Sequence, residues 1–481
     1  MEMEAAAPLP KKRISGVPGS SEPEEISSHE SAAAAAMEAA DPHIQQPLPR
    51  AEGAEEGVDR ISGLPDAVLG DIISILPTRE GARTQTLASR WRHLWRSAPL
   101  NLDYRDLPAK GDVLIALISQ ILSSHAGSGR RLLISARHLC HEPATVDAWL
   151  RSAALSNLQE LEFCCAATRS PALLPAVPST FRFSSSLRAV TIGQCRLPDG
   201  ISDTLHFPQL KQLTLEQVRI SEGSLHRIIA GCPVLECMLL DSNFGFNFVR
   251  ICSPTLRTIG VRVGFFRQGF SQFWKMVIED APCLERLLQL DLIQHIDLSI
   301  ISAPNLEIMG CLSYEDYHFS DFQGPRAVFP TVVHTMKTLS IFVYENSVDM
   351  VLSFLSCFPC LEKLYMEQKY SPSNNPWRRK HKSHIRSLDI RLKTVVLKYY
   401  RGVKSDVNFA MFFVLNAKML ELLRFEVPRC SNDFIASQQR LLQLGRRASR
   451  GARFEFTDYT CCRKLDDIKH VQDLSVVDLE W

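Results

Sequence analysis

The segment LRAVTIGQCRL, residues 187–197, contains the pattern that decides the fold. Its aliphatic residues Leu187, Val190 and Ile192 stand at positions one, four and six, and Leu197 closes the segment. Side chains of an extended chain alternate between two faces, so Val190 and Ile192 share one of them. We therefore expect a short β-strand here that directs these residues into a core.

The same spacing, with apolar residues three and five positions after the first, recurs along the chain. The first positions are Leu158, Leu187, Leu210, Leu235, Leu256, Leu287, Leu306, Met336, Leu361, Leu392 and Leu420. They are 19 to 31 residues apart, close to the roughly 20 to 29 of leucine-rich repeats. Each such unit supplies a strand and a return segment, and only stacked units cover the apolar face. The sequence therefore predicts an α/β fold, a curved solenoid with one parallel sheet from about residue 100 to 430.

Prolines mark the same period independently. They precede the first apolar position of a unit by two residues at Pro208, Pro233, Pro254, Pro304 and Pro359, whereas Pro282 precedes Leu284. Proline stops a helix from running into the strand, and unrelated leucine-rich helices, the alternative fold, would not place prolines in phase. Helical return segments are expected at 224–230, 270–279 and 348–358.

Ahead of the repeats, residues 59–95 read DRISGLPDAVLGDIISILPTREGARTQTLASRWRHLW. Pro65 and Asp66 suit the first turn of a helix, and Pro77 ends it. Thr78 is expected to cap a second helix that ends near Leu87. The apolar stripes of the first and third helices are Val68, Leu69, Ile72, Ile73 and Leu76, then Trp91, Leu94 and Trp95.

Three helices in under forty residues bury little apolar area for the entropy that their ordering costs. Their two tryptophans and five aliphatic residues therefore point to a surface that another molecule completes. Docking on the rest of this chain is the equally weighted alternative.

This segment resembles the F-box of plant F-box proteins. The match comprises Leu64-Pro65, Leu76-Pro77-Thr78-Arg79, Ala82-Arg83-Thr84, Leu87 and Arg90 to Trp95, while Ala88-Ser89 departs from the usual Ser-Arg. The resemblance implies docking on a Skp-type adaptor and, through it, on a cullin–RING ubiquitin ligase. The residues expected to contact the adaptor are Leu64, Pro65, Leu69, Ile72, Leu76, Leu87, Trp91, Leu94 and Trp95. Residues from 392 onward resemble the FBD region that follows the repeats in many of these proteins.

Four parts are therefore expected: a disordered tail at 1–57, an F-box at 58–100, the solenoid at 101–391, and an FBD-like region with a C-terminal cap at 392–481. The tail is rich in Ala, Pro, Glu and Ser. Lys11-Lys12-Arg13 and the loop at 371–382 are basic, and each is either a nuclear signal or a solvated charge cluster. We expect a nuclear or cytoplasmic protein, because a secretory signal is absent from the N-terminal residues and no apolar run reaches the ~20 residues of a membrane span. The net charge of +1 argues against a nucleic-acid partner.

No catalytic motif, metal site or cofactor is expected. Cys357 and Cys360 form a Cys-x-x-Cys without a second pair, and His138, Cys140 and His141 lack further ligands. The sequence favours a substrate receptor of a cullin–RING ligase without chemistry of its own; the alternative is a repeat scaffold that never recruits a ligase. Target contact is assigned to concave-face residues that alternate with the core leucines, in particular Tyr365, Glu367, Lys398 and Tyr400.

Overall fold

The computed structural model describes residues 60–61, 63–107, 110–135, 143–164, 176, 178–199, 205–264, 275–290, 296–314, 332–370, 385, 388–459 and 474. The chain divides into two compact units, Met1–Gly63 and Leu64–Trp481. The expected disordered tail, both basic clusters and the His138–His141 group lie outside the described residues. The second unit is described below.

The unit begins with three short helices: α1, Asp66–Ile75; α2, Thr78–Arg83, with a 3-10 turn at Thr84–Thr86; and α3, Ser89–Ser97. Arg90 of α3 donates to the Asp66 carboxylate and to the carbonyl of Leu64, each at 2.7 Å, and so fixes α3 against the start of α1. These helices share a small core of their own, made by Leu69, Ile73, Trp91, Leu94 and Ala98.

Thr78 does not cap α2, contrary to the sequence-based expectation. It is the first residue of α2 and follows Pro77, and its hydroxyl donates to the carbonyl of Asn101 at 3.0 Å. The same oxygen accepts from the amide of Asp103 at 2.7 Å. The hydroxyl thus ties α2 to β1, Leu100–Asp103, because the neighbouring strand offers a buried donor and acceptor.

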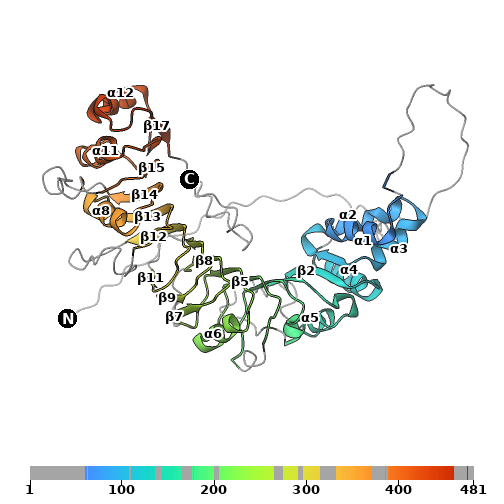
Figure 1. The fold of residues 1–481 in the computed structure, drawn as a ribbon. Coiled ribbons are helices and arrows are strands. Elements are labelled where there is room, and N and C mark those ends of the chain that lie inside the picture. The colour runs from blue at the N-terminus through green and yellow to red at the C-terminus, as the bar shows by residue number, and fades with distance from the viewer. Residues whose placement is uncertain are drawn as a thin grey trace, which may run out of the picture. The chain divides into compact units, whose positions relative to one another are not determined.

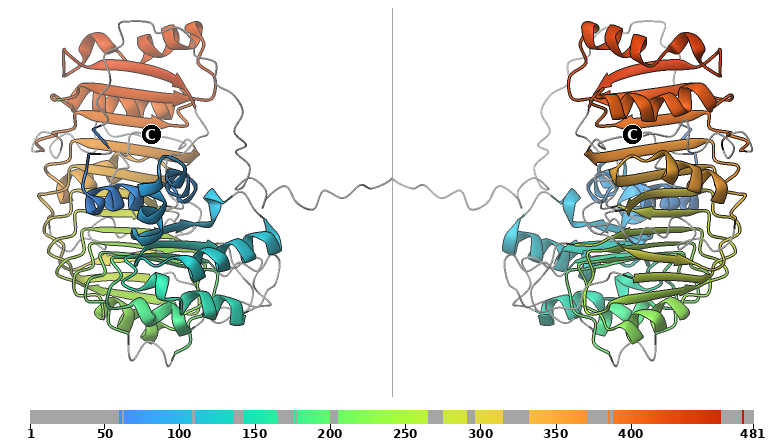
Figure 2. Two further views of the ribbon diagram at one scale, coloured as in Figure 1. Left: turned by 90° about the vertical axis from the view of Figure 1, so that its right-hand side faces the viewer. Right: turned by 90° about the vertical axis from the view of Figure 1, so that its left-hand side faces the viewer.

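A parallel sheet of 14 strands follows, in the order β1-β2-β3-β4-β5-β6-β8-β10-β12-β13-β14-β15-β16-β17. Figure 1 shows the strands arranged along an arc within this unit, and Figure 2 shows them stacked edge to edge. After β1 the strands are β2, Gly129–Ser135; β3, Glu160–Cys164; β4, Ala189–Gly193; β5, Gln212–Glu216; β6, Cys237–Asp241; β8, Thr258–Arg262; β10, Arg286–Gln289; β12, Ile308–Tyr314; β13, Thr338–Glu345; β14, Lys363–Tyr370; β15, Thr394–Lys398; β16, Leu422–Val427; and β17, Arg453–Asp458.

The predicted apolar positions form one continuous core. Leu161, Val190 and Leu213 are register partners on consecutive strands, and all three are buried. The predicted start is wrong in one repeat. This repeat starts at Leu284, which is fully buried, rather than at Leu287. The third position of that unit is Gln289, a polar residue, and this hid the correct frame in the sequence. Pro282 marked it.

Helices return the chain on the outer side of the sheet in several units (Figure 1). They are α4, Gly111–Ser124; α5, Pro143–Leu150; α6, Glu222–Ala230; α8, Val348–Cys357; α11, Lys404–Asn416; and α12, Asn432–Leu441. The expected helices at 224–230 and 348–358 are confirmed by α6 and α8.

The helix expected at 270–279 is wrong, because residues 275–280 form a strand. The strands β7, Phe248–Cys252; β9, Lys275–Asp280; and β11, Asp297–Ile300 make a second, three-stranded parallel sheet. Met276 and Ile278 of β9 are buried and alternate with less buried neighbours. This period of two is the strand signal, and the sequence contained it.

The C-terminal end of the sheet contains a helix, α12, and a last strand, β17, which forms the edge of the sheet. The helix is shorter than the predicted 432–448, since α12 ends at Leu441 and Gln443 adopts a left-handed backbone with φ of 52°. β17 pairs in parallel with β16 through six residues.

Candidate functional site

The residues that the sequence assigned to adaptor contact fall into two groups in the three-helix unit, a buried group and a more exposed one. Leu69, Trp91 and Leu94 are buried in the core of the unit, and Leu64 and Trp95 pack against that core. Pro65, Ile72 and Leu87 are exposed to solvent, and Leu76 is partly buried. The first group holds the helices together, whereas the second is accessible to another molecule.

An apolar stripe remains exposed along the outer face of α1. Val68, Ile72 and Ile75 lie at i, i+4 and i+7, so they share one side of the helix. Ile75 is 61% exposed, and Leu87, just before α3, is 65% exposed. Sequence reasoning did not assign Val68 or Ile75 to the interface. The spacing of these residues could have indicated an exposed stripe. Apolar residues lie on two sides of α1, and only one side is needed for packing against the core.

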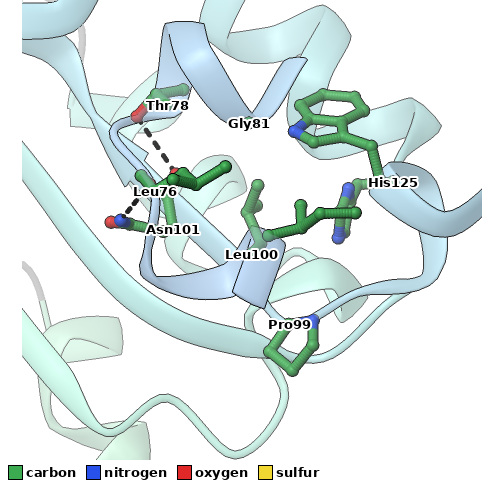
Figure 3. A pocket seen from close by; sticks show the side chains of 9 residues that line it. Leu76, Thr78, Gly81, Pro99, Leu100, Asn101 and His125 are labelled. Atoms are coloured by element: carbon green, nitrogen blue, oxygen red, sulfur yellow. Dashed lines mark hydrogen bonds between the residues drawn. The ribbon is translucent and has the colours of Figure 1, made fainter. Parts of the chain in front are cut away.

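A small pocket lies where the three helices meet the first strand, β1, and His125 (Figure 3). The imidazole of His125 contacts the indole of Trp95 edge-on, with ring centroids 5.5 Å apart. His125 Nε2 lies 2.9 Å from the carbonyl of Ala98, while the buried Nδ1 has no hydrogen-bond partner. Burial lowers the pKa of His125, partly offset by the contact with Ala98. The side chain is therefore neutral near pH 7 and serves as a packing group between the helices and the sheet.

The residues assigned to target contact lie at the C-terminal part of the sheet. Tyr365 and Glu367 of β14 alternate with core residues, and Lys398 of β15 is the register partner of Glu367. Both charged side chains are only 7% exposed, and the ammonium nitrogen lies 3.9 Å from the carboxylate. Burial raises the pKa of nearby Glu426, although the positive charge of Lys398 opposes this effect. The three groups form a buried charged cluster.

Tyr400 does not lie on the concave face with these residues. It packs in the main core, with its ring 4.7 Å from that of Phe425, and its hydroxyl donates to the side chain of Gln438 at 2.8 Å. The reason is local: β15 ends at Lys398, and Tyr399 takes a left-handed backbone with φ of 55°, which breaks the alternation.

The described residues show few features that are typical of a metal site, a reactive thiol or a membrane-spanning helix. Over the described ranges, no cluster of three or more His, Cys, Asp or Glu side chains is placed to hold a metal ion. Cys357 is buried in α8, and burial is what structural thiols show. None of the described helices combines the length and the apolar character that crossing a bilayer needs.

Comparison with known proteins identifies the repeats and the region that follows them. Residues 146–366 match the family model described as FBD-associated F-box protein At5g56370, LRR repeats, and residues 380–425 match the FBD model. The chain is 25% identical over 424 residues to the putative F-box/FBD/LRR-repeat protein At5g44950 of Arabidopsis thaliana, a match that covers 76% of this chain and 92% of that protein. Over the repeats and the region that follows them, the chain is therefore similar to plant F-box/LRR-repeat proteins that carry an FBD region.

Two further Arabidopsis thaliana relatives carry both F-box and FBD in their names. The FBD-associated F-box protein At5g22730 is 23% identical over 426 residues, which cover 78% of this chain and 89% of the relative. The F-box/FBD/LRR-repeat protein At5g22660 is 31% identical over 238 residues, 47% of this chain and 51% of the relative. The resemblance to plant F-box proteins is thereby confirmed, as is the predicted leucine-rich-repeat fold. The FBD match contains β15 and α11.

Proposed function

We propose that this F-box/LRR-repeat protein is the substrate-recognition subunit of a cullin–RING ubiquitin ligase. It docks on a Skp-type adaptor through α1 to α3, and it binds a target protein through the concave face of the sheet. The observation that supports adaptor docking best is the exposed stripe of Val68, Ile72 and Ile75 on a helix whose other side already packs a core. A small unit that leaves large aliphatic residues in water is typical of a surface that a partner covers.

The protein itself contributes no bond-making chemistry in this proposal. It holds the target near an enzyme that carries activated ubiquitin, and the gain is a high effective concentration and a fixed orientation. Such a complex would act in the nucleus or the cytoplasm.

The test compares exposed residues inside and outside the three-helix unit. Ile75→Asp and Leu87→Asp place a carboxylate where the adaptor would exclude water, which costs several kcal/mol unless the charge finds a partner. Val113→Asp is the matched control, because Val113 of α4 is 68% exposed and lies outside the stripe. We expect the first two variants to lose at least tenfold in adaptor capture, and the control to retain it.

Circular dichroism of the same variants establishes that the fold is intact, since none of the three side chains is part of the core. Equal adaptor capture by Ile75→Asp and Val113→Asp would refute the assigned surface. If the unaltered chain captures neither adaptor nor cullin, the alternative function follows: a leucine-rich-repeat scaffold that binds partners without recruiting a ligase.

A further inference from the structure

The concave face of the sheet has an apolar centre that the chain itself covers. A cluster of six buried residues is separate from the main core. Four of them lie on strands of the sheet, one follows β10 directly, and one comes from the C-terminal part of the chain. These are Leu239, Leu288, Leu290, Tyr365, Val396 and Leu474. A concave repeat surface that only met water would not bury such a row, because its side chains point away from the solenoid core.

A glycine forms the recess at the middle of this cluster. Leu239, Gly260 and Leu288 are register partners on β6, β8 and β10, so they lie side by side on the same face. Gly260 supplies no side chain, and the fully buried Leu474 fills the space. A Cβ atom built on Gly260 would lie 2.7 and 2.8 Å from the two terminal methyl carbons of Leu474. The recess therefore fits one leucine side chain in the absence of any larger residue at position 260.

Polar residues border the recess on the same strands. Two residues further along, Asp241 of β6 and Arg262 of β8 are register partners and form an ion pair of 2.6 Å. Two residues earlier, the register partner of Cys237 is Thr258. An apolar recess with an ion pair at one end of it resembles an interface hot spot, where polar groups at the rim exclude water from the anchor.

The chain is long enough for Leu474 to reach this place. Fourteen residues separate Tyr459, just beyond β17, from Leu474, and an extended chain of that length spans up to about 50 Å. From β17 to β8 there are seven strand-to-strand steps, which at about 4.8 Å each amount to about 34 Å.

We propose that the recess at Gly260 is a subsite for a leucine side chain on the target-binding face, and that Leu474 of the same chain occupies it until a target displaces it. This inference rests on the proposed function for the identity of the displacing molecule, a protein segment that presents a leucine. Leu474 lowers the fraction of chains with an open subsite, and the apparent affinity for a target falls by the same factor.

The test uses full-length chains and a labelled synthetic peptide, IKHVQDLSVVDLEW, which corresponds to residues 468–481. In the Leu474→Asp chain the recess is open, because a carboxylate does not remain in an apolar pocket. We expect this chain to bind the peptide, and the unaltered chain to bind at least tenfold more weakly, because its own Leu474 competes at high effective concentration. A Leu474→Ala chain gives the same reading should the charged variant fold poorly.

Two further changes locate the peptide in the recess. Replacing the peptide leucine that corresponds to Leu474 by alanine removes the buried equivalent of three methyl or methylene groups and should weaken binding roughly 50-fold. Replacing the same leucine by methionine, of similar volume, should have little effect. Gly260→Ala in the Leu474→Asp chain narrows the recess and should weaken binding at least tenfold, and alanine fits a strand backbone without strain.

The inference is overturned if the open chain does not bind the peptide, if open and unaltered chains bind it equally, or if the peptide leucine at the position of Leu474 is dispensable. Adaptor capture by the same variants separates this result from the proposed function. Failure of peptide binding with normal adaptor capture removes only the role of Leu474, and peptide binding without adaptor capture removes only the ligase assignment.

Discussion

Leu69→Ala should unfold the three-helix unit while the repeats stay folded. Leu69 is fully buried in a core of five residues. A buried Leu→Ala substitution costs about 2 to 5 kcal/mol, whereas a unit of about 35 residues has a total stability of about 2 to 5 kcal/mol at the usual value per residue. The loss is therefore comparable with everything that holds the helices together.

Hydrogen exchange of the full-length protein, followed by mass spectrometry, measures this effect locally. For Leu69→Ala we expect the amides of α1 and α3 to exchange roughly 30-fold to several thousand-fold faster, and those of β13 and β14 to be unchanged. Ile72→Ala is the matched control, because Ile72 is on the same helix and is 39% exposed; its effect should stay below about fivefold. Equal exchange in the two variants would show that α1 does not divide into a buried and an accessible side.

Two further predictions follow from buried titratable groups. Because the pKa of His125 is lower in the folded than in the unfolded chain, protection of α3 should be complete above about pH 6.5 and decline as the pH falls toward the folded value; exchange measured against pH tests this, and an identical decline in His125→Gln would contradict it. Lys398→Met should cost about 3 to 5 kcal/mol at pH 7, because it removes the buried ammonium group that lies beside the Glu367 and Glu426 carboxylates. Burial already raises the pKa of Glu426, so the Glu426 carboxyl favours folding most when it is protonated, and the loss measured by urea unfolding should shrink at pH 5. Equal losses at both pH values would argue against the charged cluster.

The sequence was sufficient for the elements that repeat. Every repeat carries the same spacing of apolar residues within its strand. Each first position is buried because the neighbouring repeats also direct apolar residues into the shared core. The unit at Leu284 shows the limit of this reasoning, since a buried glutamine at its third position made the frame three residues later look better. Proline phase, which reflects backbone geometry rather than hydrophobicity, identified the correct frame.

The rest depended on tertiary contacts. Which F-box residues are buried could not be read from α1, because both of its sides are apolar and only packing against α3 decides between them. The role of Thr78 depended on β1, a strand more than twenty residues away. For Tyr400, one left-handed residue reversed the direction of the side chain, and a non-glycine residue in that conformation has a weak sequence signal.

The second sheet has a consequence for the bend of the solenoid. A return helix is about 10 Å wide, whereas paired strands are about 4.8 Å apart, so helical returns wedge neighbouring repeats open on their outer edge. Between β6 and β12, the returns β7, β9 and β11 pair at the same pitch as the strands they alternate with. No wedge acts there, and this stretch should be the straightest and stiffest segment of the ribbon, with most of its turning confined to the helix-backed repeats on either flank.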